Sequence, residues 1–129
     1  MRNAARRGVT VSRASDTPRL NLPRNCRLVR RSEYDLVYRE GRRRTSREFT
    51  IFLRPNGLEI SRFGWSIKKA LGNAVRRNRI RRRLREILRL HRQEIATGWD
   101  IVIHPRTTAA TTEFSPLAAE LVKLIPRKP

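Results

Sequence analysis

Arginine dominates the stretch from Asn73 to Glu86, which reads N-A-V-R-R-N-R-I-R-R-R-L-R-E. Between Arg76 and Arg92 there are nine arginines and a single acid, Glu86. Guanidinium groups form forked hydrogen bonds to phosphate oxygens and stack on bases, so the chemistry that this stretch supports is nucleic-acid binding. The alternative is a solvated helix face, but such faces mix charges of both signs because like charges one turn apart repel. The arginine excess therefore favours a polyanionic ligand.

The apolar residues in and after this stretch predict one helix from Asn73 to about Ile95 with two unlike faces. At about 100° per residue, one face forms a core-facing stripe of Ile80, Leu84, Ile87, Leu88 and His91. The opposite face carries Asn78, Arg81, Arg82, Arg85, Arg89 and Arg92. One helix would thus pack against a core and present a dense cationic face to its ligand.

Catalysis by this chain alone would need a general acid and base, or carboxylates that hold a metal ion. The two histidines, His91 and His104, lie on separate predicted elements, and the eleven acids form no D-x-D pattern. The single cysteine, Cys26, excludes an intrachain disulfide and a cysteine-based zinc site, and it is more typical of a packed apolar residue than of a reactive thiol. These residues predict a nucleic-acid-binding protein and not an independent nuclease.

Composition agrees with this interpretation. The 129 residues suit a single domain, and 31 Lys and Arg against 11 Asp and Glu give a net charge of +20. A compact chain with this charge repels itself, which favours a polyanionic partner. No apolar run approaches the ~18 residues that a membrane span needs. We therefore expect a cytoplasmic protein with no membrane partner and no small-molecule substrate.

Residues 1–23 differ from the rest of the chain. They are rich in arginine, contain one acid, and carry prolines at positions 18 and 23 without hydrophobic periodicity. This composition predicts a mobile basic tail, followed by one nucleic-acid-binding domain over residues 24–129. An organellar transit peptide shares the arginine-rich character and is the alternative, whereas a secretory signal would need an apolar region that the tail lacks.

Periodicity within the domain predicts three helices and four strands. The first helix begins near Ser32 and ends at Gly41, and the last spans about 115–124. Strand-forming segments separated by turn signals are 48–54, 58–61, 63–68 and 99–103. The order α-β-β-β-α-β-α predicts a two-layer α/β (α+β) sandwich with a mixed four-stranded sheet.

Aromatic residues supply a second candidate surface. Tyr34 and Tyr38 lie one turn apart on the first helix, where they could stack on bases in a sequence-tolerant way. The residues alone favour the other interpretation, which is packing of an amphipathic helix against the core. Phe52 alternates with Ile51 and Leu53, so it should lie on the sheet face away from the main core.

The segment 66–86, S-I-K-K-A-L-G-N-A-V-R-R-N-R-I-R-R-R-L-R-E, resembles the signature of the bacterial ribonuclease P protein subunit. That family carries a G-N-A-V-x-R-N-R-x-[KR]-R-x-x-R-[EQ] core, the RNR motif, and the match has no gap. The predicted order of elements is also similar to the family, so that the resemblance covers about residues 24–125. It reverses the preference for Tyr34 and Tyr38 and makes them candidate base-stacking residues.

The resemblance implies a function that charge alone does not specify. Ribonuclease P removes the 5′ leader from precursor tRNA, and its RNA subunit performs the hydrolysis with Mg²⁺. The family's protein binds ribonuclease P RNA through the RNR helix and guides the leader of precursor tRNA through a cleft between the first helix and the sheet. The family's fold includes a left-handed βαβ crossover and is similar to the second domain of a small-subunit ribosomal protein. A ribosomal or general RNA-binding protein is the alternative.

Carried over by position, the resemblance assigns two sets of residues, and no catalytic residue or protein-bound metal. The RNA-subunit set is Arg77, Asn78, Arg81, Arg82 and Arg85, with Arg89 on the same helix face. The leader set is Tyr34, Tyr38, Phe52, Ser66, Lys68 and Lys69. In one departure from the family, Ala70 stands where a basic residue is usual. Lys68 would lie on the same face as position 70 if the strand continued.

Overall fold

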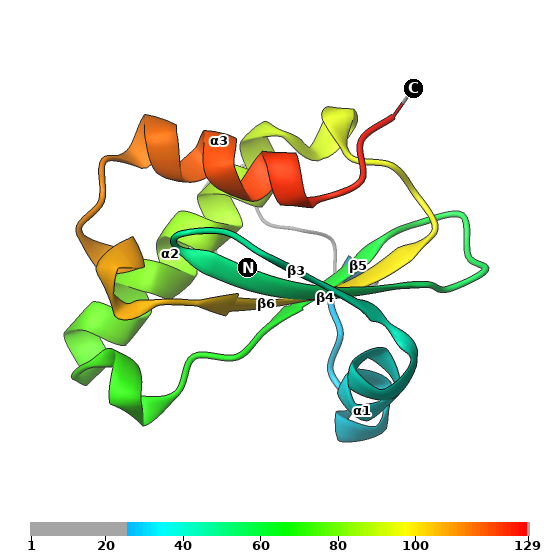
Figure 1. The fold of residues 1–129 in the computed structure, drawn as a ribbon, viewed down its shortest axis with the longest axis horizontal. Coiled ribbons are helices and arrows are strands. Elements are labelled where there is room, and N and C mark those ends of the chain that lie inside the picture. Colours follow the sequence, from blue (N-terminus) through cyan, green and yellow to red (C-terminus); the bar gives the residue numbers. More distant parts are fainter. Residues whose placement is uncertain (1–25, 129) are drawn as a thin grey trace, which may run out of the picture.

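The computed structural model describes residues 26–128, so the predicted basic tail and the start of the domain at residue 24 lie outside it. The chain folds in the order α-β-β-β-α-β-α, as the sequence predicts (Figure 1). The helices are α1 (Arg31–Glu40), α2 (Ala74–Leu90) and α3 (Phe114–Leu124). The strands are β3 (Arg42–Thr45), β4 (Phe49–Pro55), β5 (Arg62–Trp65) and β6 (Trp99–Pro105). Short 3₁₀ turns are η2 (Lys69–Leu71), η3 (Arg92–Glu94) and η4 (Thr107–Ala110).

The strands form one mixed sheet in the order β3-β4-β6-β5. β4 pairs antiparallel with β3 on one side and with β6 on the other, whereas β5 pairs parallel with β6. Because α2 connects the two parallel strands, β5, α2 and β6 form a βαβ unit, as the family resemblance implies. The predicted α/β sandwich is confirmed. The left-handed sense of the crossover stays a prediction from the family.

Two strand predictions were wrong. Residues 58–61 do not form a strand: 58–60 are bends, and the Asn56 side chain holds this loop by accepting a hydrogen bond from Leu58 N (2.7 Å) and donating one to Ile60 O (3.1 Å). The hairpin partner of β4 is β3, whose R-R-R-T sequence carries no apolar alternation. β5 also ends at Trp65, earlier than predicted.

The helix boundaries also differ from the sequence prediction, for reasons visible in the capping contacts. α1 begins at Arg31, not at Ser32, and the Glu33 carboxylate accepts from the backbone N–H groups of Val29 (3.1 Å) and Arg30 (3.0 Å). α2 has Asn73 as its N-cap, with Asn73 Oδ1 accepting from Arg76 N at 2.9 Å. It ends at Leu90, and a 3₁₀ turn replaces the predicted extension to residue 95.

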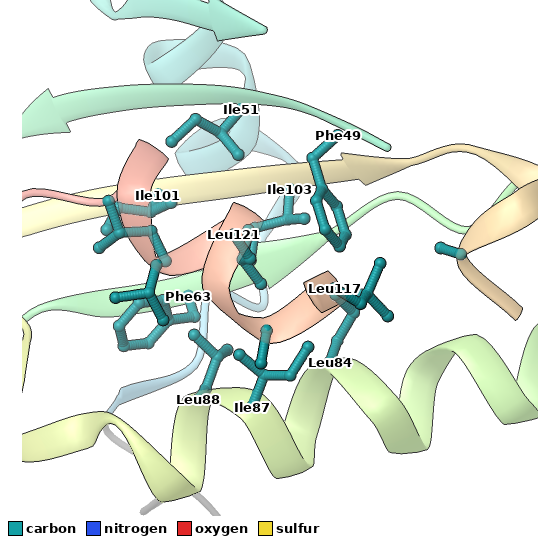
Figure 2. Packing of buried hydrophobic residues seen from close by; sticks show 14 of the residues in the cluster. Phe49, Ile51, Phe63, Leu84, Ile87, Leu88, Ile101, Ile103, Leu117 and Leu121 are labelled. Carbon is teal, nitrogen blue, oxygen red and sulfur yellow. The ribbon is translucent and has the colours of Figure 1, made fainter. Parts of the chain in front are cut away.

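The main core lies between one face of the sheet and the pair α2 and α3 (Figure 2). Its α2 side chains are the predicted ones, Ile80, Leu84, Ile87 and Leu88. His91 is the exception, since it lies just past the helix end, half-buried, with Nδ1 2.9 Å from Glu94 Oε2. Cys26 is buried, as predicted. Among residues 26–128, none of the helices has the length and apolar composition to cross a bilayer.

Within the described residues, the opposite face of the sheet is covered by α1 and by Leu28 of the segment before it. Val37 of α1, Leu28 and Val102 of β6 form a small second core, against which Tyr34 and Phe52 pack partly buried. Figure 1 shows α1 on one side of the sheet and α3 on the other. Three of the predicted leader-binding residues, Tyr34, Tyr38 and Phe52, lie on this lightly covered face.

Candidate RNA interface

The cationic face of α2 surrounds an open hollow in the protein surface. The residues that line it are Val75, Asn78, Arg81, Arg82 and Arg85. Arg81 Nη1 donates to Asn78 Oδ1 at 2.8 Å, which orients one guanidinium along the rim. Val75 is 75% exposed, so the hollow also offers an apolar contact. Four of the six predicted RNA-subunit residues are therefore gathered around one site.

Charge at this hollow is not neutralised within the described part of the chain. No acidic side chain of residues 26–128 pairs with Arg81, Arg82 or Arg85. Partial burial lowers the pKa of the Arg85 guanidinium, and the nearby charges of Arg27 and Arg81 lower it further. Crowded cations of this kind are stabilised by an anion, and phosphate oxygens match the forked geometry of guanidinium groups.

Other arginines of α2 form hydrogen bonds to groups of the protein itself. Arg77 Nε donates to Gly72 O at 3.2 Å, and Arg89 forms two hydrogen bonds with the Glu86 carboxylate at 2.9 and 2.5 Å. Arg83 Nη1 donates to Ala109 O at 2.7 Å and helps fix α2 to η4. The structure thus separates Arg77 and Arg89 from the four predicted residues at the hollow, and the role of all six in RNA binding stays a prediction.

Three rings from different elements form a compact cluster on the α1 side of the sheet. The ring centroids of Tyr38 and Phe52 are 5.1 Å apart, and His104 lies 5.5 Å from Tyr38 and 5.3 Å from Phe52. The Tyr38 hydroxyl is 2.8 Å from His104 Nε2. Tyr38 is 38% exposed, so the cluster presents ring surface to solvent. Exposed rings held in fixed positions suit stacking with unpaired bases.

Tyr34 lies one helical turn before Tyr38 and reaches a different strand. A Cβ added at Gly64 of β5 would fall 2.4 Å from the Tyr34 hydroxyl, so the ring rests directly on the bare backbone of β5. Its hydroxyl donates to Leu28 O at 3.4 Å, and burial raises its pKa. Tyr34 is therefore partly a packing residue, which agrees in part with the core interpretation, whereas Tyr38 is the more open of the two.

His104 belongs to this surface and was missed as a candidate from sequence. It follows Val102 by two residues on β6, and strand alternation would place it on the same face. Burial lowers the pKa of His104, and the positive charge of Lys68 lowers it further, so both effects favour the neutral ring. A neutral imidazole extends the aromatic surface without adding charge.

The remaining predicted leader residues follow β5. Ser66 N donates to Ile103 O at 2.9 Å, which extends the ladder by one bond and fixes Ser66 at the edge of the cluster. Lys68 is exposed and close enough to influence His104 electrostatically, while Lys69 begins η2. Because β5 ends at Trp65, Lys68 and Ala70 do not share a strand face, so the condition for placing them on one face is not met.

An ion network holds α1 on the sheet. Arg62 of β5 forms two hydrogen bonds with Asp100 of β6 at 2.9 and 2.7 Å, and a third with Glu33 of α1 at 2.8 Å. Asn56 donates to the same Asp100 carboxylate at 2.9 Å. Asp100 is only 2% exposed. This network positions the two tyrosines over the strands they contact.

Arg27 lies beside the outer edge of the sheet, where it pairs with Phe63 of β5 through an isolated bridge. Its charge lowers the pKa of Arg85 at the hollow and that of the Tyr34 hydroxyl, although burial makes the net pKa shift of Tyr34 upward. Arg27 is therefore near enough to Arg85 and to Tyr34 to influence both groups electrostatically.

A model of the family described as Ribonuclease P matches residues 22–128, which is most of the chain. The chain belongs to the ribonuclease P protein family. The ribonuclease P protein component of Syntrophus aciditrophicus is 33% identical over 111 residues, covering 86% of this chain and 93% of that protein. The component from Desulfovibrio desulfuricans is 40% identical over 111 residues, covering 82% and 85% respectively.

Solved structures of the ribonuclease P protein family share the fold. The ribonuclease P protein of Thermotoga maritima superposes with a TM-score of 0.71 at 33% identity, covering 77% of this chain and 94% of that one. A ribonuclease P protein from Staphylococcus aureus superposes with a TM-score of 0.68 at 28% identity, covering 76% and 90%.

Replacing Tyr38 or Phe52 by alanine should weaken binding of leader-bearing precursor tRNA to the reconstituted enzyme. Base stacking contributes about 1–3 kcal/mol, so a loss of about tenfold in affinity is expected. Cleavage of a substrate with almost no leader should change little. Equilibrium binding of the two substrates measures the difference, and a thermal melt of each variant provides the control. A collapse in stability with normal leader discrimination would support core packing instead.

Proposed function

We propose that this protein is the ribonuclease P subunit that binds the catalytic RNA through the α2 hollow and guides the leader of precursor tRNA across the α1 face. The observation that carries this proposal is the presence on one domain of an α2 hollow lined by arginines without acidic partners in the described residues and of a ring cluster on the α1 side of the sheet. An RNA docked on Arg81, Arg82 and Arg85 can pass unpaired nucleotides to Tyr34 and Tyr38 without crossing the hydrophobic core.

The two surfaces suit different parts of an RNA substrate. Unpaired arginines at the hollow contact phosphates of a folded RNA, which supplies affinity without sequence readout. Rings on the α1 face stack on bases, which requires single-stranded RNA. A precursor tRNA offers such a strand at its 5′ end, and a mature tRNA does not. The arrangement thus supports preference for the precursor.

The chemistry is assigned to the RNA subunit, with Mg²⁺ bound mainly there. Protonated arginines cannot accept a proton at neutral pH. They can screen phosphate repulsion between two RNAs and reduce the magnesium concentration needed to hold the complex together. Among residues 26–128, no three His, Cys, Asp or Glu side chains lie together as a metal site.

Reconstitution with a bacterial ribonuclease P RNA at low magnesium tests the proposal. The protein should restore 5′ cleavage of precursor tRNA, and the complex should bind precursor tRNA more tightly than mature tRNA. Equal binding of both, with no gain in cleavage, would instead indicate a ribosomal or general RNA-binding protein.

His91→Ala and His104→Ala should leave the cleavage step of this reconstituted enzyme nearly unchanged, because neither ring has a role in the proposed chemistry. Single-turnover cleavage at saturating enzyme is the measurement, since it separates chemistry from binding. Protein without RNA should show no magnesium-dependent cleavage. Robust processing by RNA-free protein, abolished by one of these substitutions, would make the chain itself the catalyst.

A further inference from the structure

The edge strand β3 carries three consecutive arginines, Arg42, Arg43 and Arg44, and all are exposed. β3 lies at one end of the sheet and pairs with β4, at the edge opposite β5. In the part of the chain that the structure describes, none of the three has an acidic partner. Arg44 donates to Leu124 O at 2.9 Å, where it caps the end of α3, so Arg42 and Arg43 remain available.

Strand register places these two arginines on opposite faces of the sheet. Arg43 lies directly opposite Phe52, whereas Arg42 lies opposite Leu53 of the main core face. Directly opposed residues project to the same side, and neighbouring strands are about 4.8 Å apart. Arg43 is therefore next to the aromatic cluster. Charge on an edge strand also discourages pairing with another chain, but that role does not depend on which face a side chain takes.

The aromatic surface has a direction across the sheet. Tyr34 rests on Gly64 of β5, and one turn later Tyr38 contacts His104 of β6 and Phe52 of β4. The next strand in the sheet order is β3. A strand of RNA that enters at the β5 edge and follows the tyrosines would therefore leave the protein over Arg43.

We propose that Arg43 binds a backbone phosphate of the leader where the leader leaves the cluster of Tyr38, Phe52 and His104. This inference rests on the proposed function and extends the leader's path beyond the cleft to the far edge of the sheet. Proteins that bind single strands combine stacking rings with cations that follow the backbone, and the cluster followed by Arg43 has this arrangement. The forked guanidinium can donate to two phosphate oxygens at once.

Arg43→Thr tests the proposal, with Arg42→Thr as the matched control. Both variants lose one charge from the same exposed strand and gain a residue suited to strands, but only the first alters the cleft face. The measurement is affinity of the reconstituted enzyme for precursor tRNAs with a leader that ends inside the cleft or one that crosses β3, each over a range of salt.

Arg43→Thr should weaken binding of the long-leader substrate by about fivefold to tenfold and reduce its log–log salt slope by about one. It should leave the short-leader substrate and binding of the RNA subunit unchanged, and Arg42→Thr should have little effect on any of them.

Equal losses of affinity for Arg43→Thr and Arg42→Thr would overturn the proposal, because the effect would then come from the charge of the strand and not from the position of Arg43. Equal losses with both leaders, or weaker binding of the RNA subunit, would also overturn it and place Arg43 against that RNA. An unchanged affinity of Arg43→Thr for the long-leader substrate would also overturn the proposal. Thermal melts should match between variants. If the parent protein itself fails to restore processing, the proposed function fails first, and this outcome is distinct from all the others.

Discussion

Replacing Arg81, Arg82 and Arg85 together with glutamine is expected to lower affinity for the RNA subunit by about a hundredfold, if each contact contributes about 1 kcal/mol. Each lost phosphate contact should also reduce the log–log salt slope by about one, so that a drop of about three is expected. The three arginines line one hollow and have no acidic partner within residues 26–128. Glutamine has a similar helix propensity, so α2 should persist.

The matched control is a triple glutamine variant at Arg47, Arg106 and Arg127, which are exposed and lie outside α2. It lowers the net charge equally and should change the slope far less. Filter binding or fluorescence titration against the RNA subunit over a salt series measures both variants. If the α2 variant kept the slope of the parent protein, the hollow would not be the docking surface.

Arg62→Ala should lower the free energy of unfolding by about 3 kcal/mol, as expected when one partner of a buried ion pair is removed. The reason is that Asp100, 2% exposed, would lose two hydrogen bonds from Arg62 and be left without its cationic partner in the protein interior. Because Arg62 also binds Glu33 at 2.8 Å, α1 should loosen. Leader discrimination should then fall further than affinity for the RNA subunit.

Arg54→Ala is the control, since its ion pair with Glu40 is exposed and should contribute under about 1 kcal/mol. Urea unfolding measures both variants. Equal stability of the two variants would contradict the assigned role of Arg62.

The same network predicts that the protein loses stability in acid. Backbone hydrogen bonds, chiefly from Arg30, lower the pKa of Glu33 in the folded state. The contribution of Glu33 to the free energy of unfolding is therefore present above its unfolded pKa and is lost as pH falls through its folded pKa.

The sequence predicted those parts of the fold that local patterning controls. The spacing of Ile80, Leu84, Ile87 and Leu88 defines the buried stripe of α2 without reference to the rest of the chain. The alternation of Phe52 with its strand neighbours likewise predicted, from local sequence alone, that Phe52 lies on the sheet face away from the main core. β3 could not be found in this way, because three arginines become a strand only through pairing with β4. Likewise, the loop at 58–61 depends on hydrogen bonds to Asn56.

The candidate site shows the same division. The RNR motif located the arginines, yet it did not reveal that Arg77 and Arg89 are engaged by Gly72 and Glu86 while their neighbours face the hollow. Arg27 and His104 lie near the other site residues only because the folded sheet brings segments that are distant in the sequence together. Their positions depend on tertiary contacts, for which a single sequence carries little signal. Roles in binding stay predictions for all of these residues.

The contact between Tyr34 and Gly64 has a consequence for how the family varies. Gly64 has no positive φ, so its backbone conformation does not demand glycine; the limit is Tyr34, whose hydroxyl oxygen lies 2.4 Å and whose ring carbon Cζ lies 2.6 Å from where a Cβ would stand. An aromatic ring cannot bend locally, so a larger residue at 64 would force the whole tyrosine aside. Substitutions at the two positions should therefore be correlated across relatives, with a side chain at 64 tolerated where position 34 carries a smaller group. Correlated substitutions at positions 34 and 64 would therefore show how closely α1 approaches the sheet in each relative.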